Sequence, residues 1–462
     1  MLLHHDDAHP ALIDAHTGDV ETYAALRRHV AALQPLLGHD RSLVFLFADN
    51  SVTTVLRYLG CVENGHAVAL LDAELAPSLA ARLLETYRPE IVVHPPGRAT
   101  PLPGEYAEVT EGVWKRSGQD AQLHDELALL LTTSGSTGSP KFVRLSRSNV
   151  AANATAIAQS LGLTRAERAY TSMPLHYSYG MSVLHSHLIT GAGVVVGKAD
   201  LLSPGFWESL SVFGVTSMAG VPLTFHTLRR IGFGAMELPH LKTLTQAGGR
   251  LEDRLIRYFA ELMRDRGGRF YVMYGQTEAA PRMTCLDPDR LPDKLGSVGT
   301  ALPGGELFVR TGNGRYARPG ESGAVHYRGP NVMMGYAQNR DDLALGDVTG
   351  DVLDTGDLGF LDEDGYLFVT GRTKRIAKLS GVRVGLDEVE QMLVEHGPVG
   401  VVALPPDQLG IYCAWGDDEQ FSTVRRELCR TLRVPPGSLR FVRVDALPVL
   451  PSGKIDYPAL GR

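Results

Sequence analysis

Residues 130–141 read LLTTSGSTGSPK, a loop of hydroxyl-bearing and small residues that follows the apolar run 127–131 and ends in Pro140-Lys141. The apolar run is typical of a buried strand. Glycines let several backbone N–H groups face one point, hydroxyls add donors, and the lysine adds positive charge. The pattern indicates a polyphosphate-binding loop, with a solvated turn as the alternative. It is not the P-loop of NTPases, because Pro140 precedes the lysine and Phe142 follows it.

Three later segments decide between these alternatives. YGQTE at 274–278 follows a strand predicted over 269–273, and DTGD at 354–357 precedes a hairpin predicted to turn at Asp364-Gly365. PSGK at 451–454 lies near the end of the chain. In this order, with GR at 371–372 between the last two, the chain resembles the acyl-adenylating superfamily of acyl-CoA synthetases, luciferases and peptide-synthetase adenylation domains. The resemblance covers nearly the whole chain.

Length and composition limit the possible class of protein. A chain of 462 residues is long for one core and predicts two or three lobes. A hydrophobic content of 44% with 21% charged residues is typical of a globular protein. The formal charge of −7 and the lack of a long basic tract argue against a nucleic-acid partner.

The same sequence features predict a cytoplasmic chain without membrane association. The first ten residues, MLLHHDDAHP, lack the basic start and apolar run of a signal peptide, and later apolar runs are too short to span a bilayer. The four cysteines show no CxxC spacing, so we expect reduced thiols.

Strand-like and helix-like stretches alternate through the first three quarters of the chain, which predicts an α/β fold with largely parallel sheets. Strands are expected at Leu43–Ala48, 66–71, 170–173, Gly193–Val196, 216–219 and Thr243–Gln246, and a helix at 53–64. Beyond about residue 300, short strands at Glu306–Arg310, 323–327 and 366–369 predict a small β-rich subdomain.

The last part of the sequence predicts a small, mobile α+β domain. RTKR at 372–375 is a polar joint. Helices at 386–395 and 422–432 and strands at Val399–Leu404 and 411–415 follow it. We therefore divide the chain into a large domain, 1–373, whose β-rich part is about 300–373, and a C-terminal domain, 374–462.

The resemblance implies attack of a carboxylate on the α-phosphorus of ATP, with release of pyrophosphate and formation of an acyl-AMP. Because both reactants are anionic, such a site needs cations, aimed donors and Mg²⁺. The residues that match the family's nucleotide-binding positions are Thr133, Ser134, Ser136, Thr137, Lys141, Gly248, Gly249, Tyr274, Gly275, Thr277, Asp357 and Arg372. The family usually has glycine where Phe142 stands, which puts the end of the loop in question.

Several of these residues have a structural alternative. Tyr274 can stack on adenine or belong to the core, and Glu278 can hold Mg²⁺ or cap the next segment. Gly248-Gly249 matches an adenine-contacting turn, but a glycine pair is often only a turn. A carboxylate at Asp357 can accept both ribose hydroxyls, and its alternative is to cap a β-turn. The alternative for Arg372 is a surface ion pair.

Lys454 matches the lysine that bridges the substrate carboxylate and the α-phosphate in resembling enzymes, where it acts electrostatically. A lysine near a C-terminus is otherwise a solvated tail residue. His176 matches a gate between the carboxylate pocket and the thiol channel, or is structural.

Lys374 occupies the family's hinge position, or is only a linker charge. In resembling enzymes the small domain turns there after adenylation, which removes Lys454 and brings in the loop around Lys378.

These matches predict an ATP-dependent acid–thiol ligase that uses Mg²⁺, with coenzyme A as the first choice of acceptor. A carrier protein's phosphopantetheine is second, and because the sequence ends soon after Lys454 we expect the acceptor to arrive in trans. Transfer to an amine or other nitrogen acceptor, and a non-catalytic nucleotide binder, remain alternatives.

The acid is expected to bind in a small, apolar and aromatic pocket. The matching residues are Ser178, Tyr179, Gly180, Gly220, Val221, Gln246, Ala247 and Met273. No fixed aspartate of an amino-acid pocket stands out, which favours an acyl or aryl acid. Arg282 could bind a second carboxylate of the substrate, but we expect it to form a structural ion pair.

Overall fold

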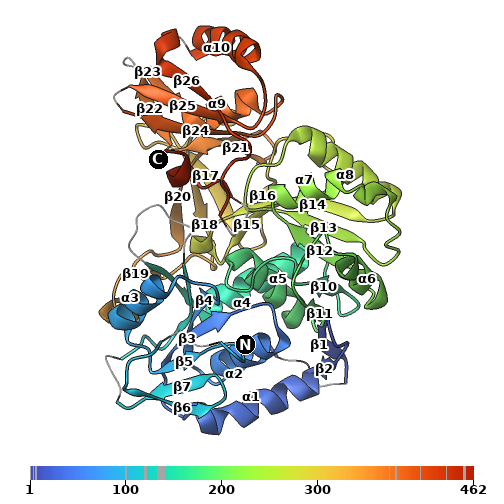
Figure 1. The fold of residues 1–462 in the computed structure, drawn as a ribbon, viewed down its shortest axis with the longest axis vertical. Coiled ribbons are helices and arrows are strands. Elements are labelled where there is room, and N and C mark those ends of the chain that lie inside the picture. The colour runs from blue at the N-terminus through green and yellow to red at the C-terminus, as the bar shows by residue number, and fades with distance from the viewer. Residues whose placement is uncertain are drawn as a thin grey trace.

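The computed structural model contains two large sheets with helices between and around them (Figure 1). A small antiparallel sheet and a separate C-terminal body follow them in the chain. The described residues are 2–3, 5, 8–98, 101–118, 122–132, 141–373, 375–379, 382–405, 407–432, 434–450 and 454–461. This architecture confirms the predicted fold class.

The first large sheet has eight strands in the order β19-β9-β8-β4-β3-β5-β7-β6. Their bounds are β3 Leu43–Ala48, β4 Ala67–Asp72, β5 Ile91–Val93, β6 Tyr106–Thr110, β7 Val113–Arg116, β8 Leu127–Thr132, β9 Phe142–Ser146 and β19 Gly335–Ala337. The four central strands, β8, β4, β3 and β5, are parallel, and the outer strands pair antiparallel.

Strand β3 shows why the centre of this sheet is apolar throughout. Val44 and Leu46 belong to one hydrophobic core, and Phe45 and Phe47 belong to another on the opposite face. Helices α1 Tyr23–Leu37 and α2 Val52–Glu63 contribute to the first core, and α3 Pro77–Tyr87 contributes to the second. A central parallel strand is covered on both faces, so every side chain of β3 is buried.

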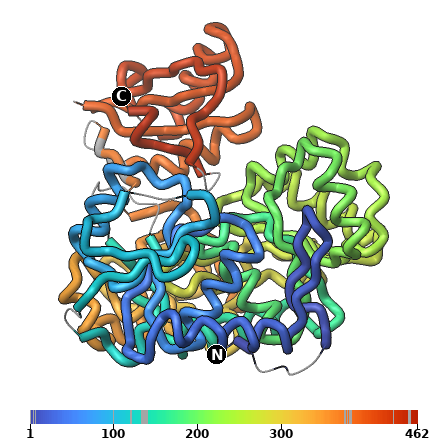
Figure 2. The backbone as a smooth tube through the Cα atoms, turned by 60° about the horizontal axis from the view of Figure 1, so that its bottom comes forward, coloured from blue at the N-terminus to red at the C-terminus, as the bar shows by residue number. Residues whose placement is uncertain are grey.

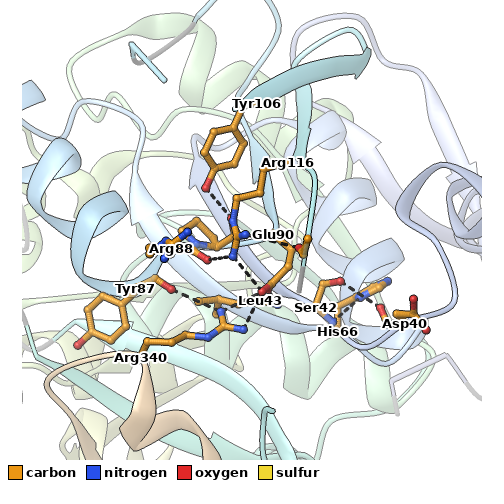
Figure 3. A network of polar contacts seen from close by, with 12 residues as sticks. Asp40, Ser42, Leu43, His66, Tyr87, Arg88, Glu90, Tyr106, Arg116 and Arg340 are labelled. Atoms are coloured by element: carbon orange, nitrogen blue, oxygen red, sulfur yellow. Dashed lines mark hydrogen bonds and ion pairs between the residues drawn. The ribbon is translucent and has the colours of Figure 1, made fainter. Parts of the chain in front are cut away.

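A network of polar contacts fastens the chain after β19 to this sheet (Figure 3). The Glu90 carboxylate is 3% exposed and accepts from the guanidinium groups of Arg116 and Arg340, at 3.3 and 2.8 Å, and from the backbone of Leu43. Burial of a carboxylate is tolerated here because its oxygens are met by two cations and an N–H group.

The second large sheet has nine strands in the order β16-β15-β14-β13-β12-β10-β11-β1-β2. Their bounds are β1 Pro10–Asp14, β2 Val20–Thr22, β10 Arg168–Tyr170, β11 Gly193–Val196, β12 Ser217–Gly220, β13 Thr243–Gln246, β14 Arg269–Gly275, β15 Arg282–Leu286 and β16 Thr300–Ala301. The associated helices are α4 Arg147–Leu161, α5 Ser178–Ile189, α6 Pro204–Val212, α7 Pro222–Arg230, α8 Asp253–Asp265, η1 Phe233–Ala235 and η2 Thr277–Ala279.

Strands β12, β13 and β14 are parallel neighbours, so their carboxyl ends lie at one edge of the sheet. Gly220-Val221, Gln246-Ala247 and Tyr274-Gly275 stand at these ends. In open α/β sheets, ligands bind at the carboxyl ends of the strands. The topology therefore brings together three sequence segments that were expected to line the acyl and nucleotide sites.

The predicted β-rich part is an antiparallel sheet in the order β17-β18-β20-β21. Its strands are β17 Glu306–Arg310, β18 Gly323–Arg328, β20 Val352–Leu361 and β21 Leu367–Arg372, and η3 Asp341–Ala344 precedes β20. The hairpin between β20 and β21 pairs Asp357 with Arg372 directly. The predicted hairpin is thus confirmed.

The residues after β21 form their own body with its own apolar core (Figure 2). It comprises the hairpin β22 Ile376–Leu379 and β23 Val382–Gly385, the sheet β24 Val399–Leu404, β25 Gln408–Cys413 and β26 Leu439–Arg443, and the helices α9 Leu386–Leu393, α10 Asp418–Leu432, η4 Pro436–Ser438 and α11 Tyr457–Leu460. Lys374 lies outside the described residues, so the division at that residue stays a prediction.

Several predicted bounds differ from the structure by a residue or more, and two strands differ by two residues or more at both ends. The strand expected at 170–173 ends at Tyr170, because the Asn50 amide takes the carbonyl oxygens of Thr171 and Met173 at 3.0 and 3.1 Å. The strand expected at 411–415 is β25, Gln408–Cys413, since its antiparallel partner β24 is six residues long and sets the register.

Candidate active site

The Asp357 carboxylate is the centre of a buried polar cluster. It accepts a short hydrogen bond from the Tyr274 hydroxyl, and Arg372 Nε donates to its Oδ1 at 3.0 Å. Asp357 is 5% exposed, and burial raises its pKa while Arg372 acts in the opposite direction. Burial, and to a lesser extent the charge of Asp357, also raise the pKa of Tyr274. Tyr274 is therefore tied to Asp357 by its hydroxyl.

The turn-capping alternative for Asp357 does not hold. Asp354, three residues earlier, accepts the N–H of Gly356 at 3.0 Å and does the capping. Asp357 instead faces Tyr274 and Arg372. The Arg372 side chain is 61% exposed, so its ion pair with Asp357 is open to solvent on the arginine side.

Glu278 stands in η2, directly after the YGQ segment. Its Oε1 accepts a hydrogen bond from the Tyr336 hydroxyl at 2.7 Å. The Lys141 ammonium lies 3.7 Å from the centroid of the same Tyr336 ring. One tyrosine thus joins the lysine that ends the phosphate-type loop to the expected metal carboxylate.

No sequence motif pointed to Tyr336 as a site residue. Its position depends on the pairing of β19 with β9, in which Gly335 and Ala337 lie opposite Arg144 and Phe142. That pairing joins segments almost 200 residues apart, and no local pattern predicts it.

Lys454 reaches the site from the last segment of the chain. The Leu450 N–H donates to the Lys454 carbonyl at 2.8 Å, and a bridge joins Val449 to Ile455, so Lys454 and Ile455 are held beside Val449 and Leu450. Its ammonium lies 6.0 Å from the Tyr177 ring centroid.

The surroundings of Lys454 are those of a site and not of a solvated tail. Burial, followed by Arg372, lowers the pKa of the ammonium, and Glu278 and Asp357 act against that shift. Lys454 is thus a partly desolvated cation that interacts electrostatically with the two carboxylates.

The expected acyl-pocket residues lie together beside this cluster. Tyr179, Val221, Ala247 and Met273 belong to one hydrophobic cluster, against which Tyr177 packs. The Tyr179 hydroxyl donates to the Thr245 carbonyl at 2.9 Å, and the Gln246 amide donates to the Gly249 carbonyl at 2.7 Å.

Close backbone approach explains the glycines of this region. A Cβ on Gly180 would lie 2.2 Å from the Pro174 carbonyl oxygen. Gly248 has φ +83°, and a Cβ there would lie 2.9 Å from the Tyr177 hydroxyl. Ser178 at the start of α5 meets Thr277, with their hydroxyl oxygens 3.1 Å apart. Gly220 and Gly275 lie at the ends of β12 and β14.

His176 directly precedes Tyr177, and its Nε2 lies 3.7 Å from a carboxylate oxygen of Asp72. Burial lowers the pKa of the imidazole, and Asp72 acts in the opposite direction. The ring is therefore partly desolvated next to the Asp72 carboxylate.

Some expected site residues fall outside the described part. Thr133, Ser134, Ser136, Thr137 and Lys374 are among them. Lys378 lies on β22, opposite Arg383 of β23.

Phe142, which stands where the resembling family usually has glycine, is a core residue. Its side chain is fully buried at the start of β9 and makes edge contacts with Phe45 and Tyr87, at centroid distances of 6.0 and 4.9 Å. Phe142 thus packs in the hydrophobic core that Phe45 and Phe47 share on one face of the eight-stranded sheet. The neighbouring Lys141 faces Tyr336.

The structural ion pair expected for Arg282 was wrong. The residue is 2% exposed, and within the described ranges no carboxylate lies at ion-pair distance from it. Its Nη1 instead points at the Met273 sulfur at 3.1 Å, and the guanidinium lies 4.8 Å from the Tyr179 ring centroid. The pairing of Arg282 with Gly275 across β14 and β15 turns the side chain inward.

Across the part of the chain that is described, no helix combines the length and the apolar character needed to cross a membrane.

Comparison with known proteins gives consistent results. Residues 4–337 match the family model described as AMP-binding enzyme. A 2-succinylbenzoate–CoA ligase of Bacillus pumilus is 29% identical over 79% of this chain and 76% of the relative. An oxalate–CoA ligase of Arabidopsis thaliana is 31% identical over 72% of this chain and 66% of the relative.

Solved structures share the fold over almost the full length. The o-succinylbenzoate CoA synthetase of Bacillus subtilis, in complex with its acyl-adenylate intermediate, has a TM-score of 0.78 at 23% identity. The match covers 98% of this chain and 95% of that one. The same enzyme with ATP and a magnesium ion has a TM-score of 0.76 at 24% identity.

Proposed function

Because the chain belongs to the family of AMP-binding enzymes, we propose that it activates a carboxylic acid with ATP as an acyl-AMP and passes the acyl group to the thiol of coenzyme A. The observation that carries the proposal is the position of Lys454 beside Tyr177, within the electrostatic reach of Glu278 and Asp357. The curated relatives named as CoA ligases support coenzyme A as the acceptor.

In the first half-reaction, a carboxylate oxygen attacks the α-phosphorus of ATP and the bond to pyrophosphate breaks. Lys454 is a cation placed where negative charge gathers between the two reactants, so it lowers the barrier electrostatically. Its partial burial strengthens this effect, because charge interactions weaken less in a site with little water.

Asp357, Tyr274 and Arg372 would hold the nucleoside. A carboxylate has about four lone-pair sites, so Asp357 can accept ribose hydroxyls while it keeps its bonds to Tyr274 and Arg372. Tyr274, fixed by that bond, presents its ring for stacking, and Gly248-Gly249 closes the adenine side. Thr277, Lys141 and the hydroxyls of Thr133, Ser134, Ser136 and Thr137 would contact the phosphates.

Glu278 fits a magnesium site. Mg²⁺ prefers oxygen ligands and binds through one or two carboxylates together with substrate phosphates and water. One Glu278 oxygen accepts from Tyr336, which orients the carboxylate and leaves the other for the metal. When bound, the ion would neutralise charge on the phosphates.

The second half-reaction requires a change of conformation. Thiol sulfur attacks the acyl carbon of the acyl-AMP, and AMP leaves. We place the hinge at Lys374, so that the 374–462 domain turns, Lys454 withdraws and the strand bearing Lys378 approaches. His176 stands where a gate to the thiol channel would lie. These roles rest on matching positions and on the separate core of the C-terminal body.

Thiol-dependent release of AMP tests the acceptor. With an accepted acid, ATP and Mg²⁺, added coenzyme A should raise AMP release well above the acid-only rate and yield a thioester. Release that coenzyme A leaves unchanged but that hydroxylamine or an amine accelerates would contradict the thiol assignment.

We place the protein in the cytoplasm, where ATP and coenzyme A are available. All four cysteines are free, as expected in a reducing compartment. Recovery of the native protein with the membrane fraction after cell lysis would contradict this location.

A further inference from the structure

Arg282 is a buried cation whose side chain meets no oxygen acceptor among the described residues. Its Nη1 points at the Met273 sulfur, and its Nε is buried without a hydrogen-bond partner. A thioether is a weak acceptor. Burying a charge without a hydrogen-bonded counter-ion is costly, so buried cations are normally paired. Burial accordingly lowers the pKa of Arg282.

Arg144 shows how this chain satisfies a structural arginine. It is fully buried, and its guanidinium donates to the carbonyls of Met334 at 2.9 Å, Tyr336 at 3.3 Å and Gly346 at 3.2 Å, and also to that of Leu345. Arg282 has none of these bonds, although the two residues are buried to nearly the same degree. The packing of the fold therefore does not account for the charge at Arg282.

Arg282 borders the acyl pocket. It contacts Met273 and Tyr179, two of the expected pocket residues, and lines a small cavity with Thr245, Ser217 and His187. His187 is neutral here, because burial lowers its pKa to about 4, and its ring nitrogens meet the Val183 carbonyl and the Ser217 hydroxyl. This cavity wall thus holds a cation and neutral hydrogen-bonding groups.

Two tyrosines connect this cation to the reacting end of the site. The Lys454 ammonium lies 6.0 Å from the Tyr177 ring, the Tyr177 and Tyr179 rings are 6.3 Å apart, and Arg282 lies 4.8 Å from the Tyr179 ring. An aromatic wall therefore has Lys454 at one end and Arg282 at the other.

We propose that the acid activated by this chain carries a second carboxylate, which the Arg282 guanidinium binds at the inner end of the acyl pocket. The inference rests on the proposed function, because the pocket is the one assigned there to the acyl group. Lys454 neutralises the carboxylate that reacts, and Arg282 neutralises the one that does not. Met273 would move aside to make room for the second carboxylate, because its thioether side chain is flexible.

The planar fork of a guanidinium matches a carboxylate, and such charge-assisted pairs are strong. A monoacid of the same skeleton would leave the guanidinium buried and unpaired. We therefore expect a diacid to be preferred over its matched monoacid by about 10- to 100-fold in the acid's kcat/KM.

The test uses matched acids and two readouts on the full chain. The pairs are butyrate with succinate, hexanoate with adipate, and benzoate with terephthalate. Each is assayed for pyrophosphate exchange into ATP and for the rise in melting temperature at saturating acid. The wild type should be stabilised by, and exchange faster with, at least one diacid relative to its partner. Arg282→Met should lose that preference, and Arg282→Lys should retain part of it.

A matched control separates binding from folding. Arg144→Met should lower the melting temperature of the ligand-free protein, because it removes the donor of four hydrogen bonds to carbonyls at a buried site. Arg282→Met should leave that temperature unchanged or raise it. An equal loss in both variants, or no diacid that stabilises the wild type more than its monoacid partner, would overturn the proposal.

The two proposals fail in different ways. Exchange that is as fast with monoacids as with diacids would contradict the second carboxylate and leave adenylation intact. If no acid supports exchange, adenylation fails, and the melting-temperature comparison alone decides whether Arg282 binds a carboxylate.

Discussion

Replacing Asp357 with asparagine should damage ATP binding more than it damages the fold. The substitution keeps the shape of the side chain and removes its charge. The bond to Tyr274 becomes one between neutral groups, which costs about 1 kcal/mol. The pair with Arg372 contributes less than about 1 kcal/mol, since that arginine is 61% exposed and screened by solvent.

Relief of the buried charge partly offsets these losses, so we expect the free energy of unfolding to fall by no more than about 2 kcal/mol. The two ribose hydroxyls, in contrast, lose a charged acceptor. At about 1.5–3 kcal/mol for hydrogen bonds to a charged group, the KM for ATP should rise by about 10- to 150-fold.

The assay compares ATP with 2′-deoxy-ATP in acid-dependent pyrophosphate exchange. The wild type should prefer ATP, and Asp357→Asn should lose most of that preference, because the 2′-hydroxyl no longer meets a carboxylate. Asp354→Asn is the control, since Asp354 lies on the same strand and its carboxylate accepts the N–H of Gly356, two residues away. A preference for ATP that survives unchanged in Asp357→Asn would refute the assignment of the ribose site.

Three further substitutions probe neighbouring parts of the site. Tyr336→Phe removes the donor that orients Glu278, so the apparent affinity for Mg²⁺ in the exchange assay should fall by about 10-fold or more; an unchanged Mg²⁺ titration would contradict this role. Phe142→Gly leaves a cavity at a fully buried site, so the free energy of unfolding, measured in urea, should fall by at least about 3 kcal/mol. A fall of less than about 1 kcal/mol would contradict the place of Phe142 in the core. Because the pKa of Lys454 is lowered and only its ammonium form acts, kcat/KM for adenylation should begin to fall with rising pH before the ordinary lysine pKa of 10.5 is reached. In Lys454→Arg, which stays charged, any remaining activity should persist to a higher pH.

The sign of the Lys454 effect on stability follows from its lowered pKa. In the folded chain the lysine loses its proton at a lower pH than in the unfolded chain, so between the two pKa values the unfolded state binds more protons. The contribution of this group to the free energy of unfolding therefore increases with pH across that window. Lys454→Met should abolish the increase.

Runs of apolar residues predicted the strands whose position depends on their own side chains. The apolar hexapeptide Leu43–Ala48 is covered on both faces and was predicted to the residue. The strand expected at 170–173 ended early because a distant side chain, Asn50, takes its carbonyls. A single sequence does not reveal such a contact.

In the candidate site, too, sequence motifs predicted some residues, and contacts between distant strands determined others. Ordered motifs identified Asp357, Tyr274 and Lys454, which the structure brings together. The link from Tyr336 to Glu278 was missed, because it depends on strand pairing across most of the large domain. The ion pair expected for Arg282 failed, since register across β14 and β15 turns that side chain toward Met273 and Tyr179.

The central claim is that Lys454 drives formation of an acyl-AMP from ATP and an acid. Its most direct test is acid-dependent exchange of labelled pyrophosphate into ATP, measured for the wild type, for Lys454→Ala and for the exposed control Lys198→Ala. The wild type and the control should exchange, and Lys454→Ala should lose at least about 100-fold while it remains folded and still transfers a supplied acyl-AMP to coenzyme A. Exchange at the wild-type rate in Lys454→Ala, or no exchange by the wild type with any acid, would contradict the claim.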